Sequence, residues 1–594
     1  MCHGLAAAHP ELEFVEKFKV VKKKEINRNK VTLISGGGSG HEPAHAGFVG
    51  KGMLDAAVCG DVFASPSQIQ VYEAIKATAS DKGTLLIIKN YSGDCMNFNN
   101  AGARAKEDDD INVDAVFVND DVAVTDSLYT VGRRGVAGTM FVHKIAGAAA
   151  EQGKDLPEVK RIAQKVIDNV ASIGFAISSC TPPAKGTPIF ELADENMEFG
   201  VGIHGEPGVA TEKFVTSDEL AEKMVARVKD NAVIQLKAGD EIAVIVNGFG
   251  GTPLSELYVL NNSVNKVIAK EGFKVHRALV GNYMTSLDME GASITFLKLD
   301  DELKALLDAP VNTPALTWGA TASEEAEAAL VAVRALAKAM NVVPAAKEEC
   351  AEKAETAKKA AKAEKKAVYE LTEKPVFAPK MNTAAFVALV DKMADVIIEN
   401  EVHFCDMDSC GDGDFGMSIA KGFRQLKKDW ATRDKANIGA FLTSASDIIM
   451  EYCGGASGPI WGSGFRYAGK AAGNADELDA TLLGKILQGA VKGVQTTGER
   501  SFGHGAVVGD KTLIALVPCA DEVTKAAEEG DSLFVAMEKG ARAAVKGAEY
   551  TKQITARLGR AGVVGEKSIG HPDAGAYGLG VIFTELTKWV KTQK

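Results

Sequence analysis

Hydrophobic residues in the first half of the chain occur in short, continuous runs that are separated by helical or polar stretches. Four of these runs are rich in β-branched residues and cover residues 31–34, 84–88, 113–118 and 241–246. Continuous apolar runs of this length are typical of strands that are buried on both faces of an α/β sheet. For residues 1–318 we therefore predict an α/β domain with two sheet-containing halves.

Three of the predicted strands lead directly into glycine-rich or polar segments, at residues 35–41, 89–94 and 247–251. In open α/β sheets, ligands bind beyond the carboxyl ends of the strands. We expect these three segments to be loops that surround a ligand site.

The second half of the chain has a different pattern. Residues 321–370 are dominated by Ala, Glu and Lys, which is typical of a solvated helical spacer. From Met381 onward apolar residues recur at helical spacing, and one predicted face carries Phe386, Leu389, Val390, Met393, Val396 and Ile397. We predict a helical linker over residues 319–380 and an all-α, barrel-like domain over residues 381–594.

Glycine clusters are expected to interrupt the helices of this second domain. They lie at residues 411–416, 454–464, 503–509 and 559–575. Glycine-rich loops between helices are well suited to a phosphate-bearing ligand, because backbone N–H groups and helix N-termini favour anions.

Composition excludes several classes of function. A chain of 594 residues suggests two to four domains, and its net charge of −12 disfavours nucleic acid or an anionic membrane as a partner. No apolar run approaches the roughly 20 residues that cross a bilayer. The nine cysteines include no Cys-x-x-Cys pair, which argues against a disulfide framework and favours a reducing, cytoplasmic setting.

Three segments of the α/β domain carry candidate chemistry. His204 lies between glycines and ahead of a proline, so its imidazole could act as base, ligand or nucleophile; the alternative is a loop histidine bonded to a backbone carbonyl. Lys89 and Asp94 could grip a hydroxyl group and take its proton, or could form a surface ion pair. The glycine-rich segment that ends in His41 differs from the dinucleotide fingerprint but could hold the oxygens of a small polyol.

The helical domain contains four carboxylates within nine residues: Asp406, Asp408, Asp412 and Asp414. Such a cluster repels itself unless a hard cation neutralises it. An EF-hand loop is excluded because its twelfth position would be Met417. Mg²⁺ together with nucleotide phosphates is the better explanation.

Further polar glycine segments of this domain, at residues 454–459, 509–512, 559–560 and 568–575, could contact a polyphosphate. Each alone could equally be a helix cap or a turn. Their presence beside the aspartate cluster favours a nucleotide site.

Taken together, the motifs at residues 36–43, 89–94, 120–129, 197–208 and 411–416 resemble those of the ATP-dependent dihydroxyacetone kinases. In that family an α/β substrate domain is fused to a helical nucleotide domain. The resemblance implies that dihydroxyacetone is held as a covalent hemiaminal on His204. It also implies that Gly38 and Lys89 contact the substrate, that His41 hydrogen-bonds it, and that Asp94 is the base.

The resemblance further implies ATP and Mg²⁺ as cofactors and a homodimer. Asp408, Asp412 and Asp414 are the expected metal ligands, although Met407 occupies the family's usual first position, which leaves Asp406 as an alternative to Asp408. The expected nucleotide contacts are Gly455, Ser457, Thr512, Arg560 and Asp573.

Three functions stay open on this basis. A kinase could accept glyceraldehyde as well as dihydroxyacetone. Some relatives of the family cleave a flavin nucleotide to a cyclic phosphate. A non-enzymatic ketose sensor is the third alternative, and the fused aspartate-bearing domain argues against it.

Overall fold

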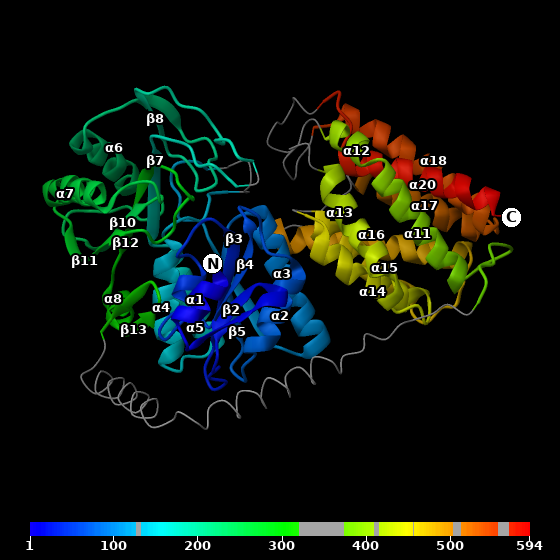
Figure 1. Cartoon of the computed structure of the whole chain (residues 1–594), viewed down its shortest axis with the longest axis horizontal. Helices are drawn as coiled ribbons and strands as arrows, with labels where there is room; N and C mark the ends of the chain where they lie inside the picture. Colours follow the sequence, from blue (N-terminus) through cyan, green and yellow to red (C-terminus); the bar gives the residue numbers. More distant parts are fainter. Residues whose placement is uncertain are drawn as a thin grey trace, which may run out of the picture.

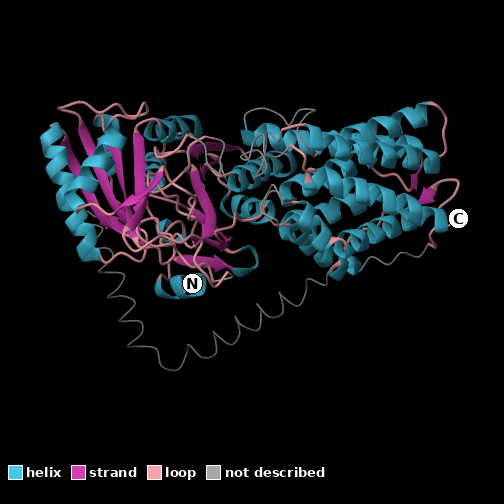
Figure 2. Cartoon of the chain, turned by 90° about the horizontal axis from the view of Figure 1, so that it is seen from above, coloured by secondary structure: helices cyan, strands magenta, loops and turns pink. Residues whose placement is uncertain are grey.

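Two lobes make up the chain, one containing both large sheets and the other almost wholly helical (Figures 1 and 2). The structure is a computed structural model that describes residues 1–125, 132–183, 185–319, 373–408, 415–454, 457–502, 513–555 and 569–593. The predicted combination of an α/β domain with two sheets and a helical domain is confirmed. The barrel-like shape of the helical domain is not confirmed by the described helices.

The first sheet has six strands in the order β1-β2-β4-β3-β5-β6. Their bounds are β1 Leu12–Val15, β2 Val20–Lys23, β3 Thr32–Ser39, β4 Ala56–Val62, β5 Thr84–Lys89 and β6 Val113–Val118. The last four are parallel, whereas β1 and β2 form an antiparallel edge.

Helices cover both faces of this sheet. Leu33, Leu85 and Ile87 pack with α4 (Thr139–Glu151) and α5 (Leu156–Ile167) in one core. Their neighbours in the strands belong to a second core with α2 (Gln68–Thr78) and α3 (Ser92–Asp109). Burial on both faces explains why the strands are continuous apolar runs.

The second sheet also has six strands, in the order β11-β10-β12-β7-β8-β9. Their bounds are β7 Val170–Ala176, β8 Asn196–Phe199, β9 Ala210–Lys213, β10 Glu241–Gly248, β11 Lys274–Gly281 and β12 Gly291–Lys298. Only β10 and β11 pair in parallel. The helices α6 (Ser217–Lys229) and α7 (Leu254–Glu271) pack on one face, and the other face joins the core of the first half.

Shorter elements complete this lobe. They are α1 (Cys2–Ala8), α8 (Asp301–Asp308), and the hairpin of β13 (Val311–Thr313) and β14 (Leu316–Trp318). The predicted linker falls largely on residues 320–372, which lie outside the described residues. The described chain resumes at residue 373 without a helix before β15 (Met381–Asn382).

The glycine segment after residue 34 differs from the sequence prediction, which places a loop from residue 35 onward. β3 continues to Ser39, because Gly36 and Gly37 pair with Val58 and Cys59 of β4. A Cβ on Gly36 would lie only 2.4 Å from the carbonyl oxygen of Val58. The glycines therefore extend the strand by permitting close strand packing.

Nine described helices form the other lobe around one hydrophobic core. Their bounds are α11 Thr383–Glu399, α12 Glu401–Met407, α13 Phe415–Lys428, α14 Ile438–Tyr452, α15 Ser457–Ala472, α16 Ala480–Phe502, α17 Leu513–Glu528, α18 Leu533–Tyr550 and α20 Ala574–Thr592. This lobe also contains a short antiparallel sheet, in which β15 pairs with β16 (Glu477–Leu478) over two residues. All but one of the apolar residues predicted to share a face of α11 are buried, and Met393 is half-buried.

The prediction that the glycine cluster at residues 454–464 interrupts the helices is wrong for the later part of the cluster. Helix α15 begins at Ser457 and contains the later glycines of the cluster. A Cβ on Gly462 would lie 2.1 Å from Cγ of Met450 in α14, and one on Gly469 would lie 2.5 Å from Oγ1 of Thr443. These glycines let two helices pack closely.

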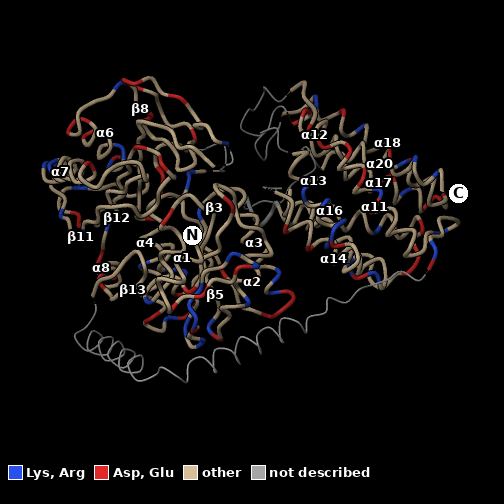
Figure 3. Tube along the Cα trace, viewed as in Figure 1, with Lys and Arg blue, Asp and Glu red and all other residues tan. Residues whose placement is uncertain are grey.

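Acidic and basic residues are interspersed over both lobes, so the net negative charge is spread over the molecule (Figure 3). Among the described residues, none of the helices combines the length and apolarity that a bilayer crossing requires. Each cysteine in the described part of the chain is a free thiol.

Candidate active site

His204 lies in the loop between β8 and β9, at the junction of the two sheets. Its side chain is 14% exposed, and its Nδ1 is 3.0 Å from Oε1 of Glu206. The other oxygen of Glu206 accepts a 2.8 Å hydrogen bond from the backbone N–H of His204. Because a carboxylate can only accept, Nδ1 of His204 carries a proton and Nε2 is the atom available for chemistry.

His41, from the loop after β3, meets this imidazole. The two Nε2 atoms are 3.0 Å apart, and Nδ1 of His41 donates to the carbonyl oxygen of Thr285 over 2.8 Å. With both Nδ1 atoms protonated, the Nε2–Nε2 contact requires one shared proton. Burial lowers the pKa of His41 well below its ordinary value, and the neighbouring Lys89 and His204 lower it further.

Aromatic rings form the walls around the histidine pair. Phe63 stacks on His41 with ring centroids 5.2 Å apart, and it meets His204 edge-on at the same distance. Tyr91 meets His204 edge-on at 4.6 Å. These rings limit the motion of both imidazoles and exclude water from their faces. Sequence reasoning missed both rings, although Tyr91 lies within the motif of residues 89–94.

Lys89 and Asp94 are not a surface ion pair, since both side chains are buried. Lys89 ends β5, and Asp94 lies in the first turn of α3. A Cβ on Gly37 would lie 3.4 Å from Lys89 Nζ and 3.5 Å from Asp94 Oδ2, so the bare glycine leaves space beside both groups. The predicted contact residue Gly38 lies beside the backbone of residues 63–64.

Three buried polar atoms around Lys89 and Asp94 are available to hydrogen-bond a ligand. Lys89 Nζ, Tyr91 Oη and Asp94 Oδ1 are buried and make no hydrogen bond within the described residues. A buried polar atom without a hydrogen bond raises the free energy of the folded state, so a bound ligand that supplies the missing hydrogen bonds would be stabilising. Burial raises the pKa of Asp94, and the charge of Lys89 offsets this only in part. Burial lowers the pKa of Lys89, opposed by Asp94 and Glu206.

Glu206 is a further residue of the candidate site that sequence reasoning overlooked. Burial alone would raise its pKa, but the charge and hydrogen bond of His204 and the charge of Arg134 outweigh burial and hold the pKa at about 2. Arg134 in turn bonds Asp121 and the carbonyl oxygen of Gly200. The signal was available in the sequence, because Glu206 follows His204 by two residues in a glycine-rich loop.

The resemblance to the dihydroxyacetone kinases implies covalent capture of a carbonyl compound on His204. On that basis, replacing Glu206 by glutamine is expected to weaken the capture by about tenfold or more, because a cationic imidazole loses its charged partner. Titration of the protein with dihydroxyacetone, followed by reductive trapping and intact-mass analysis, measures this. Glu198→Gln is the matched control, since Glu198 bonds the N–H of Gly208 in the same loop. Equal capture by both variants and the wild type would contradict the assigned role.

The predicted residues of the helical lobe are only partly described. Ser457 begins α15, and Asp573 caps α20 by accepting a 2.8 Å bond from the N–H of Ala576. Asp408 follows α12, and its Oδ2 accepts a 3.4 Å bond from the N–H of Phe415. The other predicted metal and nucleotide residues lie outside the described residues: Asp412, Asp414, Gly455, Thr512 and Arg560.

No cluster of three or more potential metal ligands occurs among the residues that the structure describes. Asp406 and Asp408 lie next to the undescribed residues 409–414, so this finding does not bear on a site that includes them. Their carboxylates are the hard oxygen donors that Mg²⁺ accepts.

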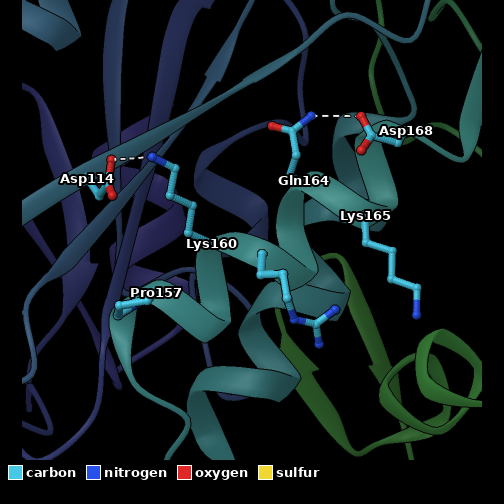
Figure 4. Close-up of a pocket in the computed structure, with 7 residues that line it drawn as sticks. Asp114, Pro157, Lys160, Gln164, Lys165 and Asp168 are labelled. Atoms are coloured by element: carbon cyan, nitrogen blue, oxygen red, sulfur yellow. Dashed lines mark hydrogen bonds and ion pairs between the residues drawn. The ribbon is translucent and has the colours of Figure 1, made fainter.

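A surface pocket of about 520 Å³ lies elsewhere, along the outer side of α5 (Figure 4). Its cations are already paired: Lys160 bonds Asp114 over 2.7 Å, and Arg161 and Lys165 bond Glu302. With its charges satisfied and none of the predicted residues in its lining, this pocket is not the candidate active site.

Two family models match the chain. A Dak1 domain matches residues 3–315, and a DAK2 domain matches residues 409–588. The first covers the lobe with the two sheets, and the second covers most of the helical lobe.

Relatives match one domain or the whole chain. The dihydroxyacetone-binding subunit of PTS-dependent dihydroxyacetone kinase 1 from Listeria innocua is 51% identical over 54% of this chain and 96% of its own length. L-erythrulose 1-kinase of Mycolicibacterium smegmatis is 35% identical over 98% of this chain and 96% of its own. Triokinase/FMN cyclase of Rattus norvegicus is 33% identical over 99% and 96%, respectively.

Proposed function

Because the chain belongs to the family of proteins that join a Dak1 domain to a DAK2 domain, we propose that it transfers the γ-phosphate of ATP to dihydroxyacetone. Residues 1–318 bind the acceptor, and residues 381–594 bind the nucleotide. The observation that carries the proposal is the juxtaposition of the His204–His41 pair with buried Lys89 and Asp94. The Tyr91 ring connects them, since it lies 4.6 Å from the His204 ring and 5.4 Å from Lys89 Nζ. The imidazole of His204 can attack a carbonyl carbon, and the nearby carboxylate can take a proton from a hydroxyl group. A hydroxyketone carries both of these groups.

Capture of the ketone uses the shared proton of the histidine pair. His41 Nε2 takes that proton, which frees the lone pair of His204 Nε2 to attack the carbonyl carbon. As the carbon–oxygen π bond breaks, His41 passes this proton to the carbonyl oxygen. The product is a hemiaminal on a cationic imidazole, and the Glu206 carboxylate faces that charge.

Phosphoryl transfer then depends on Asp94. Its carboxylate accepts the proton of the substrate hydroxyl, whose oxygen bonds the γ-phosphorus of ATP as the bond from that phosphorus to the leaving ADP breaks. Lys89 donates to the substrate oxygens. Asp408, Asp412 and Asp414 would hold Mg²⁺, which neutralises the charge of the ATP phosphates when bound. Gly455, Ser457, Thr512, Arg560 and Asp573 are the proposed nucleotide contacts.

The name of the full-length relative L-erythrulose 1-kinase supports a broader acceptor range. Both L-erythrulose and glyceraldehyde have a carbonyl beside a hydroxyl group, so either could form the same adduct.

We also propose that the chain acts as a homodimer in a reducing, cytoplasmic setting.

A second candidate function is formation of a cyclic phosphate from a flavin nucleotide. It is favoured by the name triokinase/FMN cyclase of a relative that covers nearly the whole chain. This reaction would use the nucleotide domain and would not need the ketone adduct on His204.

ATP consumption with five compounds in parallel tests these functions. We expect turnover with dihydroxyacetone, glyceraldehyde and L-erythrulose, and turnover lower by about 10³-fold or more with glycerol, which has no carbonyl. Chelation of Mg²⁺ should abolish the reaction. Asp412→Ala should do the same while dihydroxyacetone still forms its adduct. No turnover of dihydroxyacetone above the blank would contradict the kinase proposal, and product formation from FAD alone would support the cyclase.

A further inference from the structure

The helical lobe contacts the α/β lobe along α2 and α3, the two helices that face α14 and α16 in Figure 1. Near the end of α3, Asp108 receives two hydrogen bonds of 2.7 and 2.8 Å from Nη2 of Arg466 in α15. Arg104 bonds Asp447 of α14 over 2.8 Å, and Lys470 bonds Glu107 over 2.9 Å. We call these three contacts the interdomain seam.

The seam is more than a set of exposed charges. Only 9% of the Arg466 side chain and 14% of the Arg104 side chain are exposed. The Arg104 guanidinium also lies 4.3 Å from the ring centre of Tyr72 in α2, so it is held on both sides. A cavity of only about 20 Å³ remains between the lobes at this position, which indicates close packing.

Two of the three seam helices, α3 and α15, carry proposed reaction groups at their opposite ends. Asp94 lies in the first turn of α3, about 21 Å along the helix axis from Asp108. Ser457 begins α15, about 14 Å from Arg466. Because an α-helix transmits position rigidly over such lengths, fixing the seam constrains where Asp94 and Ser457 stand relative to each other.

From this geometry we propose that Arg466 and Asp108, supported by the other two pairs, are positioning residues that align the phosphate-donor domain with the acceptor site. The inference rests on the proposed kinase function. The charges are arranged for recognition, with cations of the helical lobe on Asp108 and Glu107 and a cation of the α/β lobe on Asp447. Complementary charges across an interface select register and orientation.

Charge reversal tests the seam in the full chain. Asp108→Arg should lower kcat for dihydroxyacetone phosphorylation by about tenfold or more, because like charges then face each other. The KM for ATP and the mass adduct on His204 should be unchanged, since each domain keeps its own site. Combining Asp108→Arg with Arg466→Asp should raise kcat at least about threefold over Asp108→Arg alone, because the pair across the seam is re-formed. Full recovery is not expected, since the new arginine also faces Arg104, whose Nε bonds Asp108 over 3.3 Å in the wild type.

Lys160→Asp is the matched control, because its ion pair with Asp114 lies within the α/β lobe, away from the site. It should leave kcat unchanged. If Asp108→Arg melts below the assay temperature, the more exposed pair of Glu107 and Lys470 replaces it, with the single reversals and the swap. A kcat within about twofold of the wild type for the folded single reversals, or a folded swap that restores nothing, would overturn the inference. Wild-type kinase activity and the adduct report on the proposed function independently.

Discussion

Replacing His204 by alanine is expected to abolish the covalent adduct with dihydroxyacetone and to lower kcat/KM by about 10³-fold or more, because the substrate loses the bond that holds it in place. His41 cannot substitute for it. Its Nδ1 bonds the neutral carbonyl of Thr285 where His204 has a carboxylate, and burial with the charge of Lys89 disfavours the cationic imidazole that an adduct would create. Intact-mass analysis after reductive trapping and steady-state ATP consumption measure the two effects.

His276→Ala is the control for this experiment. His276 is a partly exposed histidine that bonds Asp308 over 2.8 Å, and it makes no described contact with the active site. Its adduct and its activity should equal those of the wild type. An adduct that persists in His204→Ala would show that another residue is the nucleophile.

Asp94→Asn is expected to separate capture from phosphoryl transfer. The variant should form the His204 adduct at the wild-type level, because Asp94 makes no described hydrogen bond to either histidine. Its kcat should fall by about 10²–10⁴-fold, because amide nitrogen and oxygen cannot accept the hydroxyl proton at neutral pH. A kcat close to that of the wild type would assign the base to another group.

The pH profile follows from the raised pKa of Asp94. The base acts only when ionised, so kcat should fall as pH decreases through a pKa above the ordinary aspartate value of about 3.9. In Asp94→Asn this acid limb should be missing. A limb that persists unchanged in the variant would belong to a different group.

The same shift has a consequence for stability. A carboxyl whose pKa is raised by folding stabilises the fold below its unfolded pKa, and this contribution is lost as pH rises through the folded value. At neutral pH the buried carboxylate of Asp94 therefore destabilises the protein, and Asp94→Asn should melt at a higher temperature than the wild type. Glu206 behaves oppositely: its contribution is present above an unfolded pKa of about 4.3 and is lost as pH falls towards about 2.

Chemistry encoded in short segments could be predicted from the sequence. The strands β3, β5, β6 and β10 follow from their apolar runs, and Lys89 and Asp94 follow from their position after β5. These inferences succeed because hydrophobic periodicity and residues close in sequence decide them. The same local reasoning placed a loop at Gly36, where strand pairing with Val58 prevails.

Contacts between distant segments could not be predicted in this way. His41 and His204 are 163 positions apart, and Asp108 and Arg466 are 358 apart. The local sequence around one residue of such a pair does not identify its partner, because the contact depends on how whole sheets and helices pack. The same holds for Phe63, whose ring lies against both histidines.

The sequence by itself therefore determined the two-domain architecture, the family resemblance and the reactive groups, because each depends on patterns within one element or one loop. Only the tertiary structure decided which groups act together. It paired the Nε2 atoms of His41 and His204, placed the Glu206 carboxylate on Nδ1, and buried Lys89 with Asp94. It also joined α3 to α15 at the seam. The physical reason is burial: protonation states and ion pairs depend on what surrounds a group in space.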